Sequence, residues 1–171
     1  LPRLSVVAFD EHVPVAQNFD RAVRASNGRW CTILCADDEL DSGYFEHAAS
    51  QLNGPFAAVS QFVTVEAAEQ FGYPPTHGDT ERRAYGQEWL VEHGGWTYNA
   101  FPLSTTMFRR SVFDRLGGYS AWGGGPSCDG EFWLRMVYEA GGTILATGLK
   151  GGTYRPRYGT WASGPRGRDD Y

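Results

Sequence analysis

The apolar positions of the first 65 residues change spacing several times along the chain. Segments with apolar side chains every three or four positions predict helices, and short runs of apolar and β-branched residues predict strands. The order strand, helix, strand, helix, strand favours an α/β layer with parallel strands and right-handed crossovers. The predicted strands are 4–9, 29–35 and 55–65, and the predicted helices are 14–26, with a left-handed end at Asn27-Gly28, and 41–52, with Asp41 or Ser42 as its cap.

The second half of the chain has a looser pattern up to residue 99 and a clearer one after it. Between residues 66 and 99 the sequence holds several glycines and prolines and one modest helix candidate, 81–93. The later segments predict a strand at 101–108, a short helix with a capping box at Ser111 and Asp114 that ends at Gly117-Gly118, a helix opened by Asp129 and ended by Gly141-Gly142, and a strand at 143–147.

Length, composition and charge limit the function classes. A chain of 171 residues is about one domain, so 1–171 is treated as a single unit. Aromatic residues make up 15%, which suits flat partners such as sugars or bases. The net charge of −5 provides no basic field for nucleic acid or an anionic membrane. Three cysteines without zinc spacing indicate reduced thiols and a cytoplasmic protein, although a part outside this sequence could provide peripheral membrane association.

The stretch ILCADDELD, residues 33–41, runs an apolar segment into four carboxylates among five residues. In open α/β sheets, ligands bind beyond the carboxyl ends of the strands, which is where Asp37 and Asp38 stand. Two carboxylates together with substrate phosphates are a common way to hold Mg²⁺ or Mn²⁺. The alternative is a solvated turn in which Asp41 caps the following helix.

Three blocks of the sequence together resemble family 2 glycosyltransferases, the inverting enzymes of the GT-A fold. The first is NFDRAVRASNGRWCTILCADDELDSGYFE, which ends in an acidic metal motif and an aromatic-bearing helix. The others are MFRRSVFDRLGGYSAW and CDGEFWLRMVYEAGG, with a Gly-Gly-aromatic turn and an acidic residue at a helix start. The blocks keep the family's order and cover most of residues 13–145.

The resemblance implies a GT-A-like, Rossmann-like α/β fold with a mixed, mostly parallel sheet flanked by helices. It implies that Asp38 and Asp37 hold a divalent metal, Mg²⁺ or Mn²⁺, and that they and Asn18 bind a nucleotide-diphosphate sugar. Asp129 would be the base that activates a carbohydrate or other hydroxyl acceptor for inverting transfer. The parts would be a donor and metal part (13–65), a variable region (66–100), an acceptor and base part (101–150) and a tail (151–171).

Two positions depart from the family pattern. Cys35 stands where another Asp is common, and Cys128-Asp129 replaces a commoner Glu-Asp pair. Without the resemblance, Asp129 would be read as a helix N-cap. Family members also usually begin with a further strand, helix and strand, so we expect an incomplete domain with an incomplete nucleotide pocket.

Several other side chains have two interpretations each. Tyr119 and Trp122 either stack on an acceptor sugar or plug the core. Arg109 and Arg110 either meet phosphate or are solvated beside a helix start. In the tail, Arg155 and Arg157 either approach the diphosphate or have no fixed role.

Two other functions remain as alternatives to the glycosyltransferase. One is a non-catalytic GT-A remnant that binds carbohydrate or protein. The other is a nucleotidyltransferase, which shares metal-diphosphate chemistry but normally needs a Gly-rich, basic loop that this sequence does not show.

Overall fold

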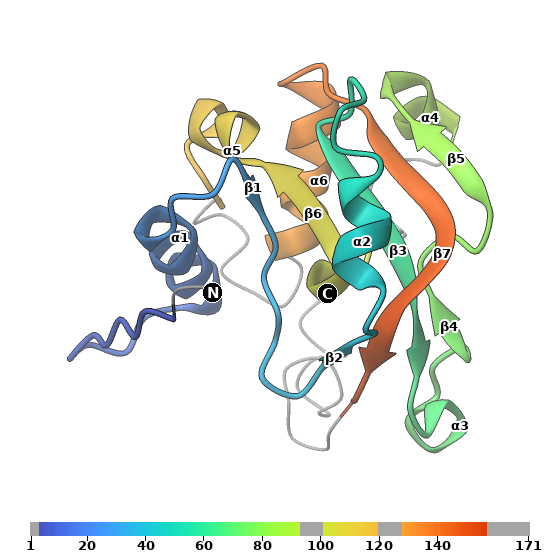
Figure 1. Cartoon of the computed structure of the whole chain (residues 1–171), viewed down its shortest axis with the longest axis horizontal. Helices are drawn as coiled ribbons and strands as arrows, with labels where there is room; N and C mark the ends of the chain where they lie inside the picture. The colour runs from blue at the N-terminus through green and yellow to red at the C-terminus, as the bar shows by residue number, and fades with distance from the viewer. Residues whose placement is uncertain (1–3, 93–100, 120–127, 157–171) are drawn as a thin grey trace.

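The computed structural model describes residues 4–92, 101–119 and 128–156, which form one mixed sheet with helices on both faces (Figure 1). The strands are β1 (Trp30–Cys31), β2 (Glu39–Leu40), β3 (Ala58–Val65), β4 (Thr76–His77), β5 (Arg82–Tyr85), β6 (Thr106–Arg109) and β7 (Ile144–Tyr154). The helices are α1 (Val15–Ala25), α2 (Tyr44–Ala49), α3 (Ala68–Phe71), α4 (Gln87–Glu92), α5 (Arg110–Leu116), α6 (Cys128–Tyr138) and the 3-10 helix η1 (Leu103–Thr105).

The sheet is mostly antiparallel, so the prediction of a mostly parallel sheet is wrong. Its order is β1-β6-β3-β7-β2, with β4 also on β3 and β5 also on β7. Within the described ranges only β3 and β7 pair in parallel. The cause is β6, which comes late in the sequence but inserts between β1 and β3 and runs antiparallel to both. The mixed α/β class itself is as predicted.

Three predicted strands are shorter than expected or absent. Residues 4–9 form no strand, and Leu4 and Val6 are 92% and 87% exposed. Of the predicted strand 29–35, only Trp30–Cys31 pairs with β6. Beyond that pair, the Thr32 hydroxyl shares its proton between the Thr106 and Ser104 carbonyls, so a side chain replaces part of the backbone ladder there. The predicted strand 101–108 is also shorter than expected, because its first part forms the 3-10 helix η1 and only its last part belongs to β6.

The positions of the main helices agree with the prediction, whereas several of the predicted helix ends and caps do not. α1, α5 and α6 lie where predicted, whereas the candidate at 81–93 divides into β5 and α4. The predicted end of α5 at Gly117-Gly118 is confirmed, and Gly117 is left-handed there, with φ of 77°. The end of α1 is not left-handed, because Ser26 is extended. Neither α2 nor α5 has a side-chain cap, so Asp41 does not cap α2 and the predicted capping box at Ser111 does not form.

The two faces of the sheet bury different clusters. The larger cluster packs α1, α5 and α6 against one face, with Phe108 at its centre, and the smaller packs α2 against the other face at Met107. Phe108 and Met107 point to opposite faces of the sheet because successive side chains of a strand alternate between its two faces. Figure 1 shows α2 in front of the sheet and α6 behind it. No helix in the described ranges is both long enough and apolar enough to cross a membrane.

Candidate functional site

Asp37 and Asp38 lie in the turn between β1 and β2, beside the end of β7. β2 is held there by antiparallel pairing with Gly152 and Thr153. Gly152 permits this approach, because a Cβ at that position would overlap the Glu39 carbonyl oxygen. The short β2 strand therefore fixes the acidic turn against the end of the longest strand.

The Asp38 carboxylate accepts one hydrogen bond on each oxygen. The Ser104 hydroxyl of η1 donates to Oδ2 at 2.5 Å, and the backbone N–H of Arg155, just after β7, donates to Oδ1 at 3.2 Å. Burial raises the pKa of Asp38, and the negative charge of Asp37 adds to that rise, while the two hydrogen bonds oppose it. A cation at this carboxylate would favour its ionised form in the same way as the two donors do.

Asp37 differs from its neighbour in its contacts. Its side chain is half-buried and makes no hydrogen bond or ion pair with any residue that the structure describes. Its oxygens therefore retain more acceptor capacity than those of Asp38.

The charge of Asp129 acts on a cysteine beside this turn. Asp129 lies in the first turn of α6, directly after Cys128. Burial raises the pKa of Cys35 to about 11, and the charges of Asp38, Asp37 and Asp129 all add to the rise. Burial likewise raises the pKa of Cys128 to about 12, with smaller contributions from Asp129 and Cys35. Cys35 is thus within electrostatic range of both predicted acidic sites, which belong to distant parts of the chain.

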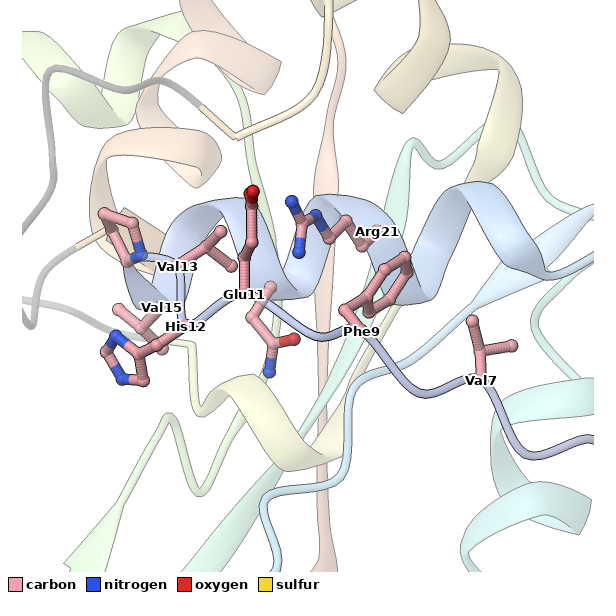
Figure 2. A pocket seen from close by; sticks show the side chains of 9 residues that line it. Val7, Phe9, Glu11, His12, Val13, Val15 and Arg21 are labelled. Carbon is pink, nitrogen blue, oxygen red and sulfur yellow. The ribbon is translucent and has the colours of Figure 1, made fainter.

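The structure places Asn18 in a different hollow. It is exposed on α1 and helps to line a hollow of about 820 Å³ between α1 and the chain before it. Figure 2 shows this hollow, with the Arg21 guanidinium against the Phe9 ring at 4.4 Å from its centre. All of its lining residues fall between residues 7 and 21, so it includes none of the acidic residues described above.

Of the two residues predicted to contact an acceptor sugar, the structure describes only Tyr119. Tyr119 is 6% exposed, and its ring packs against Phe19, Phe113 and Phe132, which is the core interpretation of this residue. Trp122 lies outside the described residues.

The two candidate phosphate-binding arginines donate hydrogen bonds to backbone carbonyls of the fold. Arg109 donates to the carbonyls of Phe56 and Gly54, which holds the loop before β3. Arg110 donates to the carbonyls of Val23 and Ser26 at the end of α1. Neither arginine is simply solvated.

Arg155 of the tail is also paired. Its guanidinium forms ion pairs with Glu39 and Glu66 beside the acidic turn. Arg157 lies outside the described residues.

Two polar residues at or near the site have no counterpart in the sequence prediction. Ser104 contacts Asp38 directly, yet it lies in a segment whose pattern indicated only a strand. Asp20 accepts a hydrogen bond from the backbone N–H of Tyr119 at 2.7 Å and so links α1 to the turn after α5. Neither residue stands out in the sequence, because Asp20 lies among other polar residues of α1 and Ser104 is followed by two threonines.

The acidic turn suits a hard divalent cation bound together with a phosphate ligand. The described residues include no group of three or more His, Cys, Asp or Glu that could hold a metal without other ligands. Mg²⁺ and Mn²⁺ are often held by only one or two carboxylates plus substrate phosphates. A carboxylate has about four acceptor sites, so the two hydrogen bonds to Asp38 leave about two. Asp37 and Asp38 could therefore supply carboxylate oxygens to a divalent cation whose other ligands come from a bound phosphate.

Neither the models of known protein families nor the curated proteins give a match to this chain.

Proposed function

We propose that this chain is a GT-A-type glycosyltransferase domain that transfers a sugar from a nucleotide-diphosphate donor to an acceptor hydroxyl with inversion. The observation that carries the proposal is the Asp38 carboxylate beside Asp37, which two hydrogen bonds hold in place just before β2. Asp129 lies in the first turn of α6, and its charge adds to the rise in the pKa of the Cys35 thiol next to this turn. Inverting transfer needs two acidic centres of this kind near one sugar, one on the leaving-group side and one on the acceptor side.

The two acidic centres have different roles in this proposal. Asp37 and Asp38 would hold Mg²⁺ or Mn²⁺, and that cation would supply positive charge to offset the charge on the departing diphosphate. Asp129 accepts the proton of the acceptor hydroxyl. The acceptor oxygen then forms a bond to the anomeric carbon as the bond from that carbon to the donor phosphate oxygen breaks, and the nucleoside diphosphate leaves.

We also propose that the chain works in the reducing environment of the cytoplasm. Cys31, Cys35 and Cys128 are all free thiols in the structure. Persistent free thiols are the usual state in the cytosol, where disulfides are rare.

The donor-site half of the proposal is tested by calorimetry. The chain is titrated with UDP, GDP and dTDP sugars in the presence of Mn²⁺, and we expect binding of one class that EDTA abolishes. Asp38→Ala should remove this binding, because it deletes a carboxylate of the metal pair. If a folded chain binds none of the donors up to millimolar concentration, the donor-site assignment is wrong.

The base assignment is tested separately with Asp129→Asn. This variant should retain donor affinity and lose about 10²- to 10⁴-fold in transfer rate, because the amide cannot accept the proton. The rate is measured as release of nucleoside diphosphate with a panel of hydroxyl acceptors. The control is Glu139→Gln, an exposed acid just after α6. Equal rates for Asp129→Asn and Glu139→Gln would show that Asp129 is not the base.

A second candidate is a non-catalytic module that binds carbohydrate or protein. The observation in its favour is that both Asp38 oxygens already accept hydrogen bonds within the fold, which a purely structural role would also explain. This function predicts ligand binding that EDTA leaves unchanged and no release of nucleoside diphosphate from any donor.

A further inference from the structure

The Ser104 hydroxyl is buried directly behind the acidic turn. We propose that Ser104 is a positioning residue that fixes the Asp38 carboxylate for a divalent cation and the donor diphosphate. This inference rests on the proposed function, since it concerns the same metal and donor site.

The direction of the hydrogen bond follows from the contacts of Ser104. Its side chain lies in η1 and the residue is 4% exposed. The backbone N–H of Cys35 donates to Ser104 Oγ at 3.3 Å, which occupies one of the oxygen's lone pairs. A hydroxyl has a single proton to donate. Asp38 Oδ2, at 2.5 Å, is the acceptor that receives it.

Ser104 is itself held by neighbouring elements. Its carbonyl oxygen shares the Thr32 hydroxyl proton with the Thr106 carbonyl, at 3.4 and 3.1 Å, and the Thr32 hydroxyl accepts from Tyr44 Oη at 3.2 Å. The next residue, Thr105, donates through its hydroxyl to the Gln61 carbonyl of β3 at 2.6 Å. The donor to Asp38 is therefore anchored to the segment after β1, to α2 and to the centre of the sheet.

The two donors to Asp38 come from different parts of the fold. Ser104 approaches from η1, and the Arg155 N–H approaches from the end of β7. Two hydrogen bonds on opposite oxygens restrict rotation of a carboxylate about its χ2 torsion, which is otherwise broad. Loss of the Ser104 donor would leave Asp38 with one of them. Removal of a hydrogen-bond partner behind a metal ligand typically weakens metal affinity 10- to 100-fold.

The test compares Ser104→Ala with a matched control, Ser60→Ala. Ser60 is also a buried serine of the sheet region, 2% exposed, and its hydroxyl contacts Thr106 Oγ1 at 2.9 Å. Mn²⁺ binding to each full chain is measured by electron paramagnetic resonance, with and without UDP, and thermal unfolding is recorded for both. We expect the Mn²⁺ dissociation constant of Ser104→Ala to rise about 10-fold or more, and that of Ser60→Ala to stay within about 2-fold of the unsubstituted chain.

A further variant guards against misfolding of Ser104→Ala. Ser104→Cys nearly keeps the volume but replaces the hydroxyl with a weak donor. It should weaken Mn²⁺ binding by a smaller factor than the alanine variant, at unchanged melting temperature.

The outcomes separate this inference from the proposed function. If the unsubstituted chain binds Mn²⁺ and UDP, and the Ser104 variants bind them equally well, only the positioning role is overturned. Equal weakening by Ser104→Ala and Ser60→Ala would also overturn it, since the effect would then be general destabilisation. If the unsubstituted chain binds no Mn²⁺ with or without UDP, the donor site and the positioning role both fail.

Discussion

The four carboxylates of the acidic stretch have different environments although they are nearly adjacent. Asp38 is held by two hydrogen bonds, Glu39 pairs with Arg155, and Asp41 pairs with Lys150 at 3.3 Å. Only Asp37 has no such partner among the described residues. A charge cluster in a sequence can thus contain carboxylates that are ion-paired, hydrogen-bonded or without either kind of partner.

We expect the stability of the fold to fall at high pH because of the buried Cys128 thiol at the start of α6. It is 2% exposed, and burial raises its pKa to about 12. An unfolded cysteine has a pKa near 8.5, so the folded value is the higher one. Such a group contributes stability that is fully present below about pH 8.5 and is lost as the pH rises towards 12.

Cys128→Ala should therefore reduce the loss of unfolding free energy on going from pH 7 to pH 10. Urea unfolding of both proteins at the two pH values measures this. The cavity left by the substitution lowers stability at both pH values, so it cancels in the comparison. Identical pH-dependent losses in the two proteins would contradict the prediction.

At the scale of elements, the turn after α5 is clamped by side chains from two other helices. These side chains bind consecutive backbone groups of the turn and so tie α1, α5 and α6 together. The contacts are Asp20 to the Tyr119 N–H, Arg24 to the Gly117 carbonyl, and Arg135 to the Leu116 and Gly118 carbonyls. Gly118 has φ of 92° and lies against the Asp20 carboxylate, where a Cβ would meet an oxygen at 2.5 Å.

Asp20→Ala should lower the free energy of unfolding by about 1–3 kcal/mol, because it leaves the Tyr119 N–H without its acceptor. The control is Asp114→Ala. Asp114, like Asp20, forms an i,i+4 ion pair with an arginine, and its side chain is 51% exposed. Asp20 differs because it also accepts a hydrogen bond from a backbone N–H. An exposed pair of this kind contributes roughly 0.3–0.5 kcal/mol. Urea unfolding that gives the same small loss for both variants would show that the clamp is unimportant.

The helices could be predicted from the sequence more readily than the strands. α1 and α6 have an apolar stripe with local spacing, and Gly117-Gly118 marks the end of α5 in the sequence itself. Strand neighbours are not local, and nothing in the sequence indicated that β6 would lie between β1 and β3. Residues 4–9 have a strand-like composition, yet the described chain offers them no strand partner.

At the scale of the whole molecule, the residue types of the site could be predicted but their partners could not. Asp37, Asp38 and Asp129 follow recognisable patterns at a strand end and a helix start. Ser104 and the Arg155 N–H reach Asp38 only through the tertiary fold. A backbone N–H has no sequence signal, and a lone serine has many roles, so the geometry of the site becomes apparent only in three dimensions.

The contacts of Asp38 also bear on the order in which the chain folds. Its partners lie 66 and 117 residues further along the sequence, and the parallel pairing of β3 with β7 joins Ala58 to Ile144. When two distant segments come into contact, the chain first loses the entropy of the loop between them and only then gains stability. Such contacts therefore form slowly. During synthesis the acidic turn emerges early and β7 emerges late. A nascent chain that has not yet completed β7 therefore has every carboxylate of the site but lacks the arrangement that would make them selective for a ligand.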